Sequence, residues 1–191
     1  MNDCVSEDIY CIMCDRVIDC QMGFDTGLDV ILCETCSEAM KYGFMVRAPL
    51  YENRTCSVQV LSRVLAEEFV GDKPYTMISI TDTVRMPAKL KDDVNRKFLT
   101  RCVFYDVVDG KYAMKQQDID SVVDIVDKSL KGGIFKFVIH CERGISRSSG
   151  VAAAISKYIN NESDLLFKYY APNTDVYVKV LMALKESHIL D

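Results

Sequence analysis

The chain has 191 residues, of which 49% are hydrophobic, and its formal net charge at pH 7 is −5. This length is enough to bury one substantial core with a small appendage beside it. No apolar run approaches the roughly 18 residues that span a bilayer, and the N-terminal MNDCVSEDIY is acidic, unlike a secretory signal. We therefore expect a cytoplasmic protein without a membrane partner.

Four of the nine cysteines form two pairs with the spacing of metal ligands. The odd total, in a chain expected in the cytoplasm, argues against a disulfide scaffold. The pairs each place two sulfurs on one turn, as in four-thiolate zinc sites; they are Cys11, Cys14, Cys33 and Cys36. We predict a structural zinc, because four thiolates leave no position for a reacting water. Redox pairs or free thiols are the alternative.

The segment around these cysteines is acidic. Residues 1–41 carry nine Asp or Glu side chains against one Arg and one Lys. Such a segment repels a phosphate backbone, so a nucleic-acid partner is not expected. If the zinc-binding element has a partner, its charge favours a protein with a basic surface.

A change in composition after the paired cysteines indicates a domain boundary. Between Gly43 and Cys56, the segment RAPLYENRT has the Pro and the turn formers of irregular chain. We place a zinc-binding domain, of zinc-ribbon or treble-clef type, at residues 1–50 and a larger domain at residues 51–191.

Strand-like and helix-like patterns alternate through the larger domain. Short apolar runs predict strands at residues 75–81, 102–105 and 134–139. Apolar residues at helical spacing predict helices at residues 62–70, 117–130, 149–158 and 175–185. This alternation predicts an α/β fold with a mainly parallel sheet flanked by helices. Such sheets bind ligands at the carboxyl ends of their strands.

The most informative segment, HCERGISRSSG, follows the last predicted strand. Cys141 stands at the end of that strand, Arg147 follows after five residues, and a helix begins near Ser148. Backbone N–H groups and a helix N-terminus stabilise a thiolate, so Cys141 fits a nucleophile. A lone cysteine is usually a small buried residue. However, a chance match of His, Cys, Gly, Arg and Ser at these offsets is on the order of one in a million per position.

The other residues of this loop fit the binding of a phosphoryl group. Arg147 can bind two phosphoryl oxygens with its planar fork, and the loop amides can ring all three. The predicted substrate-binding residues are Glu142, Arg143, Gly144, Ile145, Ser146 and Arg147. Gly144 supplies conformational freedom, Ser148 donates a hydrogen bond to the leaving sulfur, and His140 orients the loop.

The segment HCERGISRS resembles the active-site signature of the Cys-dependent protein tyrosine and dual-specificity phosphatases. The stretches VLSRVLAEEF, PYTMISITD, FYDVV and APNTDVYVKVL are similar to the compact bacterial and phage branch of that family. The resemblance covers roughly residues 57–187. It implies a four- or five-stranded sheet and a two-step reaction through a phosphocysteine, with no metal for catalysis.

The resemblance also implies an Asp that acts as general acid about thirty to thirty-five residues before the cysteine. Asp106 and Asp109 in FYDVVDG lie 35 and 32 residues before Cys141. We favour Asp106, because the apolar run before it places it at the end of a strand. Either residue is otherwise a solvated loop carboxylate or a helix cap.

The expected activity is that of a protein phosphatase acting on phosphotyrosine in a phosphoprotein. The sequence has no clear counterpart of the second-loop Gln of the tyrosine-specific members, so activity on phosphoserine and phosphothreonine is not excluded. The main alternative is a phosphate-binding adaptor that keeps the loop but lacks an Asp above it. Sulfur transfer and arsenate reduction are disfavoured by the place and spacing of the loop. A zinc interaction module is disfavoured by the size of the second domain.

Overall fold

The computed structural model describes residues 9–10, 17–18, 24–25, 31–32, 44–47, 56–108, 110–187 and 189–190. The chain divides into two compact units, Met1–Gly43 and Phe44–Asp191. The division falls a few residues before the boundary that the sequence predicts. In the first unit, short strands pair in two antiparallel sheets; they are β1 (Ile9–Tyr10) with β2 (Val17–Ile18), and β3 (Phe24–Asp25) with β4 (Ile31–Leu32).

The four cysteines predicted to bind zinc lie outside the described residues; they are Cys11, Cys14, Cys33 and Cys36. The structural zinc and the zinc-ribbon or treble-clef element therefore stay predictions.

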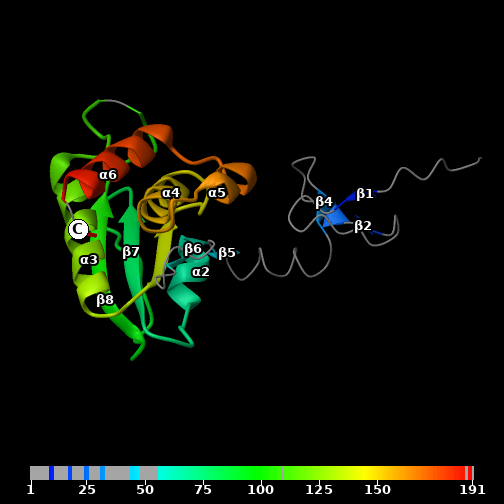
Figure 1. Cartoon of the computed structure of the whole chain (residues 1–191), viewed down its shortest axis with the longest axis horizontal. Helices are drawn as coiled ribbons and strands as arrows, with labels where there is room; N and C mark the ends of the chain where they lie inside the picture. The colour runs from blue at the N-terminus through cyan, green and yellow to red at the C-terminus, as the bar shows by residue number, and fades with distance from the viewer. Residues whose placement is uncertain are drawn as a thin grey trace, which may run out of the picture. The chain divides into compact units, whose positions relative to one another are not determined.

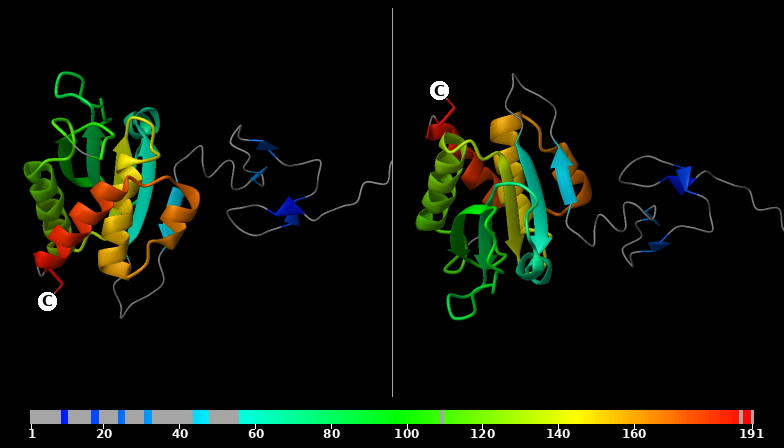
Figure 2. Two further views of the ribbon diagram at one scale, coloured as in Figure 1. Left: turned by 90° about the horizontal axis from the view of Figure 1, so that it is seen from above. Right: turned by 90° about the horizontal axis from the view of Figure 1, so that it is seen from below.

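The second unit is built on a five-stranded sheet (Figures 1 and 2). Its strands, in spatial order, are β5 (Phe44–Arg47), β6 (Ser57–Ser62), β9 (Lys136–Cys141), β7 (Tyr75–Thr81) and β8 (Arg96–Val103). The last four are parallel, and only the edge strand β5 is antiparallel to its neighbour. The predicted α/β fold with a mainly parallel sheet is confirmed.

Helices cover both faces of this sheet. They are α2 (Arg63–Glu68), α3 (Gln116–Lys131), α4 (Arg147–Asn160), α5 (Asp164–Tyr169) and α6 (Thr174–Glu186). Figures 1 and 2 show α3, α4 and α6 on one face, with α2 apart from them. No helix in the described segments is long and apolar enough to cross a membrane.

The core follows the two-residue repeat of the strands. In β9, Phe137 and Ile139 pack in the large cluster with α3, α4 and α6, whereas Val138 packs in a smaller cluster with α2. In β7, Ile78 joins the large cluster and Met77 the smaller one. Because successive side chains of a strand point to opposite faces, Cys141 lies on the side of α4 and His140 on the side of α2.

In the second unit, sequence reasoning missed the strands β5 and β6, the helix α5 and the first six residues of β8. β8 is an edge strand, and its first six residues are alternately half-buried and exposed. Polar side chains occupy many of these positions, so the apolar signal is confined to the last residues of the strand. The helices α2, α3, α4 and α6 and the strands β7 and β9 were predicted close to their observed bounds.

Candidate active site

The loop of interest joins the carboxyl end of β9 to the first turn of α4. Cys141 is the last residue of β9 and Arg147 is the first residue of α4. Gly144 lies between them with a φ of 70°. A Cβ atom there would lie 2.6 Å from the backbone of Leu61 and Ser62. Only glycine therefore allows the loop to pass this close to the end of β6.

The Cys141 sulfur is held by donors from its own loop. Its Sγ atom lies 3.1 Å from the Ser148 hydroxyl, and the Gly144 backbone N–H donates to it at 3.2 Å. Burial alone would raise the pKa of the Cys141 thiol. The hydrogen bonds from Ser148 and Gly144, together with the positive charge of Arg147, outweigh burial and lower that pKa. This environment favours the thiolate form, which is the nucleophile.

The same loop presents backbone N–H groups that have no acceptor within the described part of the chain. They belong to Glu142, Arg143, Ile145, Ser146 and Arg147. Consecutive free amides in one tight loop bind anions, and the N-terminus of α4 adds its dipole. A ligand with several acceptor oxygens and negative charge matches this loop.

Arg147 is buried, and its Nη1 and Nε groups have different surroundings. Its Nη1 group donates to the Asp82 carboxylate and, at 2.7 Å, to the Phe104 carbonyl oxygen. Its Nε–H is buried and meets no acceptor among the described residues. An unsatisfied charged donor in such a place costs free energy. An anion beside the loop would supply the missing acceptor.

The loop forms the floor of a recess of about 330 Å³. Its lining residues are Asp82, Asp106, Cys141, Glu142, Arg143, Ile145, Ser146 and Arg147. The structure thus brings the predicted nucleophile, the predicted acid Asp106 and most of the predicted binding loop into one recess. Asp109, the second predicted acid, lies outside the described residues.

Asp106 is positioned by one of its two carboxylate oxygens. Its Oδ1 atom accepts hydrogen bonds from the Ser146 hydroxyl at 2.8 Å and from the Asn173 side-chain amide at 3.0 Å. Its Oδ2 atom has no hydrogen-bond partner in the described residues. The carboxyl group is therefore oriented through one oxygen.

Glu142 and Arg143 differ in their surroundings. The Glu142 carboxylate accepts from the Arg63 guanidinium at 3.1 Å, which offsets its negative charge. Arg63 also donates to the carbonyl oxygens of Met86 and Pro87, so it ties the loop to the segment after β7. Arg143 is exposed and lines the recess.

His140 lies beneath the loop rather than in the recess. It is fully buried, and its Nε2 atom lies 2.8 Å from the Ser79 hydroxyl on the neighbouring strand β7. Burial lowers the pKa of His140 to about 4, with a smaller contribution from the nearby Arg101 charge. The ring is therefore neutral near pH 7, and its contact with Ser79 fixes the end of β9.

Cys56 and Cys102 have the opposite environment to Cys141. Both are buried, and burial raises the pKa of each thiol to about 12. They are therefore protonated at neutral pH and unreactive.

Sequence reasoning missed Asp82, Arg63 and Asn173. Asp82 directly follows β7, as Asp106 follows the apolar end of β8, so the rule that places ligands at strand ends would have found it. Arg63 and Asn173 belong to helix starts far from the loop in sequence, and no local pattern links them to it.

Comparison with known proteins gives structural matches alone. No family model and no curated protein matches the sequence. One similar structure is the human tyrosine phosphatase-like serine/threonine/tyrosine-interacting protein, with 16% identity, a TM-score of 0.48, and coverage of 70% of this chain and 93% of that chain. Another is a mouse putative dual specificity phosphatase complexed with zinc tungstate, with 12% identity, a TM-score of 0.48, and coverage of 73% of this chain and 87% of that chain. A third is the Cydia pomonella PTP-2 phosphatase, with 14% identity, a TM-score of 0.45, and coverage of 71% of this chain and 88% of that chain.

Proposed function

We propose that the chain is a protein phosphatase that hydrolyses phosphate monoesters through a phosphocysteine on Cys141. The observation that carries this proposal is one loop in which a thiol of lowered pKa lies among free backbone amides and a buried arginine Nε–H without an acceptor. A phosphoryl group satisfies all of these donors and places its phosphorus beside the sulfur.

In the first step, the Cys141 thiolate attacks phosphorus. The sulfur–phosphorus bond forms while the ester oxygen–phosphorus bond breaks, and the protonated Asp106 gives its proton to the leaving oxygen. The Arg147 Nε–H and the loop amides bind the charge that spreads over the equatorial oxygens. Ser146 and Asn173 hold the Asp106 carboxyl group in the recess for this transfer.

In the second step, water attacks the phosphocysteine. Asp106, now ionised, takes a proton from the water as the sulfur–phosphorus bond breaks, which releases inorganic phosphate. The Ser148 hydroxyl, 3.1 Å from Sγ, donates to the sulfur as it regains its negative charge. No residue of this scheme requires a metal ion.

The substrate we propose is a phosphoprotein with phosphotyrosine, and phosphoserine and phosphothreonine remain open. The recess carries one exposed cation, Arg143, and one exposed apolar side chain, Ile145, beside the reactive sulfur. These suit a peptide that lies across the recess.

The second candidate is a phosphate-binding adaptor with the same loop and no turnover. It gains support only if no carboxyl group reaches the leaving oxygen. Asp106 lines the recess with Cys141, which favours the enzyme.

The test compares two aryl phosphates, one with a poor phenolate leaving group and one with a dinitrophenolate that leaves without a proton. We expect wild type to hydrolyse both, and Cys141→Ser to hydrolyse neither. Asp106→Asn should lose about a hundredfold or more in kcat/KM, which reports on the first step, with phenyl phosphate, the usual contribution of a general acid, and much less with dinitrophenyl phosphate. Asp120→Asn, an exposed aspartate on α3, is the matched control.

Absence of turnover in wild type, together with tight binding of vanadate, would support the adaptor instead. Equal losses of kcat/KM for Asp106→Asn with both substrates would remove Asp106 from the role of general acid.

A further inference from the structure

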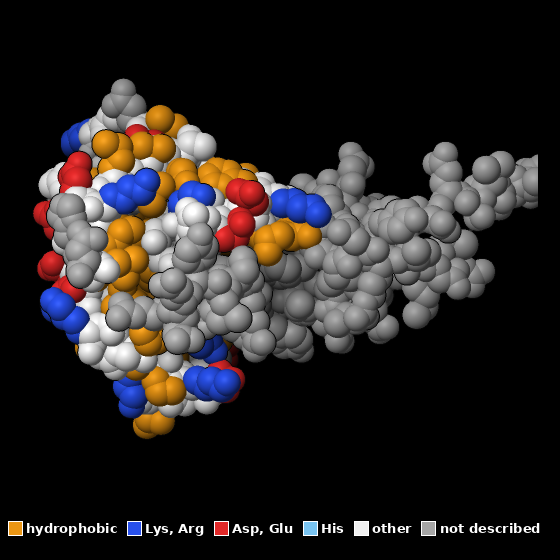
Figure 3. Space-filling model, in the orientation of Figure 1, with side chains coloured by type: hydrophobic (Ala, Val, Ile, Leu, Met, Phe, Trp, Pro, Cys, Tyr) orange, Lys and Arg blue, Asp and Glu red, His pale blue; other side chains and the backbone are white. Residues whose placement is uncertain are grey.

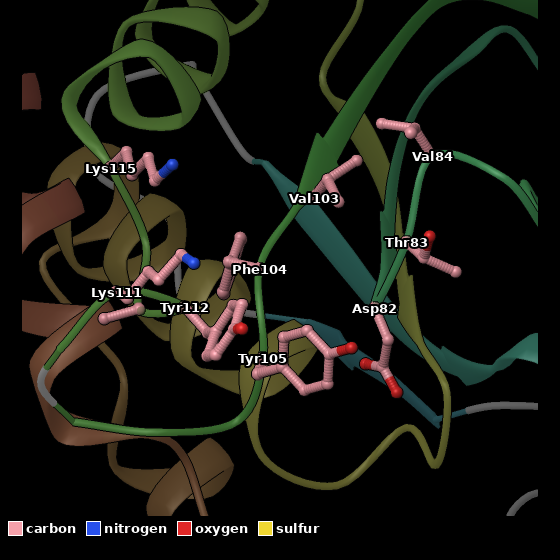
Figure 4. A pocket seen from close by; sticks show the side chains of 10 residues that line it. Asp82, Thr83, Val84, Val103, Phe104, Tyr105, Lys111, Tyr112 and Lys115 are labelled. Carbon is pink, nitrogen blue, oxygen red and sulfur yellow. The ribbon is translucent and has the colours of Figure 1, made fainter.

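A second recess adjoins the one that contains Cys141. Its volume is about 290 Å³, and Asp82 lines both recesses. Its remaining lining residues come from the segment after β7, the end of β8 and the chain before α3; they are Thr83, Val84, Val103, Phe104, Tyr105, Lys111, Tyr112, Ala113 and Lys115. Figure 4 shows nine of the ten by name. The second recess has no part in the reaction proposed above.

Two lysines give this recess its charge. In Figure 4, Lys111 and Lys115 extend from the same wall. Neither ammonium group has a carboxylate within ion-pair distance in the described segments. The one described carboxylate of the recess, on Asp82, is paired with Arg147. On the one face drawn in Figure 3, basic and acidic side chains are interspersed, whereas the second recess gathers two lysines without a described counter-ion.

Two tyrosines lie between the lysines and Asp82. The rings of Tyr105 and Tyr112 are 5.2 Å apart, and both are partly exposed. Lys111 lies 5.4 Å from the Tyr112 ring centroid. Tyr105 directly precedes Asp106 in the chain, and its hydroxyl end faces Asp82 in Figure 4. The aromatic pair therefore lies between Asp82, which lines both recesses, and Lys111.

We propose that this second recess is a subsite for an anionic group that flanks the reacting phosphate on the same peptide. The anion is a carboxylate of Asp or Glu, or a second phosphate. Lys111 and Lys115 are its counter-ions, and Tyr105 with Tyr112 packs against the intervening chain. The inference rests on the proposed function, because it assumes a phosphopeptide in the first recess.

The expected preference is moderate and sensitive to salt. Exposed ion pairs contribute little individually, so two of them raise kcat/KM by about fivefold over a neutral flank. Screening removes most of this gain near 1 M salt, where the Debye length falls to about 3 Å. A preference that arose from apolar packing would survive at high salt.

The test measures kcat/KM for a series of phosphotyrosine peptides. In each peptide a single position, either before or after the phosphotyrosine, is varied. Each position carries Asn, Asp or phosphoserine in turn, so the last two arms separate the carboxylate from the second phosphate. At one position, wild type should prefer an acidic residue to Asn by about fivefold at low salt. The double variant Lys111→Gln/Lys115→Gln should bring this ratio close to one. Lys128→Gln, an exposed lysine near the end of α3, should keep the wild-type ratio.

A wild-type ratio close to one at every position overturns the subsite, and so does a double variant that keeps the wild-type ratio. Hydrolysis of phenyl phosphate by wild type reports separately on the proposed function. If wild type hydrolyses neither phenyl phosphate nor the peptides, the ratio of dissociation constants for the same peptides decides on the subsite by the same criteria.

Discussion

At the scale of single residues, Gly144 decides whether the loop can form. Its φ of 70° and the 2.6 Å that would separate a Cβ atom from the Leu61 and Ser62 backbone leave no room for a side chain. Gly133 has a similar φ of 71°, but a Cβ atom there meets nothing within 4 Å. The two glycines therefore separate the cost of the backbone conformation from the cost of the clash.

We predict that Gly133→Ala lowers the free energy of unfolding by about 1 kcal/mol, the cost of a left-handed conformation. Gly144→Ala should lower it by about 3 kcal/mol or more, since the clash is with backbone atoms, and should abolish vanadate binding. Urea denaturation and vanadate titration measure both effects. Equal stabilities of the two variants would contradict the proposed geometry of the loop.

His140 makes a second residue-level prediction, about pH. Its pKa is about 4 in the folded protein, below the ordinary 6.5 of the unfolded chain. Between these values the unfolded chain binds more protons, so the free energy of unfolding falls as pH decreases from about 6.5 to about 4. The loss is on the order of a few kcal/mol.

His140→Gln should reduce this decrease, because glutamine does not titrate and its amide can still bond to Ser79. The measurement is urea denaturation of both proteins at several pH values in that window. Carboxylates of lowered pKa, such as Asp93, also reduce the free energy of unfolding at lower pH in both proteins, so the difference between the two curves isolates His140. Parallel curves would show that His140 is not buried in its neutral form.

At the scale of elements, the start of α6 is coupled to the acid. Asn173 is the N-cap of α6, where its side-chain oxygen accepts from the Val176 N–H at 3.1 Å. Its side-chain amide donates to Asp106 at 3.0 Å. The close approach of α6 to α4 depends on Gly150, where a Cβ atom would lie 2.8 Å from the Asn173 carbonyl oxygen. One residue thus caps a helix and positions a carboxyl group.

We predict that Asn173→Ser separates these two functions. Serine is a good N-cap, so the free energy of unfolding should change by no more than about 0.5 kcal/mol. Serine has no amide to reach Asp106, so kcat/KM should fall more with phenyl phosphate than with dinitrophenyl phosphate. If kcat/KM falls equally for both substrates, Asn173 does not act through the acid.

The loop and the strand before it could be predicted from the sequence because their signals are local. The loop from Cys141 to Ser148, which includes Gly144, directly follows the apolar run of β9. Each of its signature residues meets a specific chemical requirement of the loop. The contacts of Asn173 and Arg63 could not be predicted in this way. They join the loop to helix starts whose distance from it is set by the packing of α6 and α2 on the sheet.

At the scale of the whole molecule, the described residues that line the candidate active site all belong to the second unit. The zinc predicted for the four paired cysteines would then be structural and have no part in the reaction. We predict one zinc per chain, measured by atomic absorption, and its loss in Cys14→Ser/Cys36→Ser. Cys56→Ser is the control that keeps zinc.

A chelator that removes this zinc should leave the rate at which iodoacetamide alkylates Cys141 in the protein unchanged. The rate is measured by mass spectrometry of the peptide that contains Cys141. A lower rate after removal of zinc would show that the first unit influences the site, and absence of zinc in wild type would favour free or redox-active thiols.

The α/β class and the mainly parallel sheet followed from the alternation of strand and helix signals along the chain. The order of the strands did not, because β9 inserts between β6 and β7, and no short-range pattern encodes that pairing. The second recess could not be predicted from the sequence either, since its walls come from three separate segments.

The most direct test of the proposed function is to look for the phosphocysteine itself. Wild type and Asp106→Asn are mixed with dinitrophenyl phosphate, quenched within the first turnover and analysed by peptide mass spectrometry. We predict one phosphoryl group on the peptide that contains Cys141, in a larger fraction of Asp106→Asn because water is no longer deprotonated in the second step, and none in Cys141→Ser. Hydrolysis by wild type without any phosphoryl group on Cys141 would contradict the account.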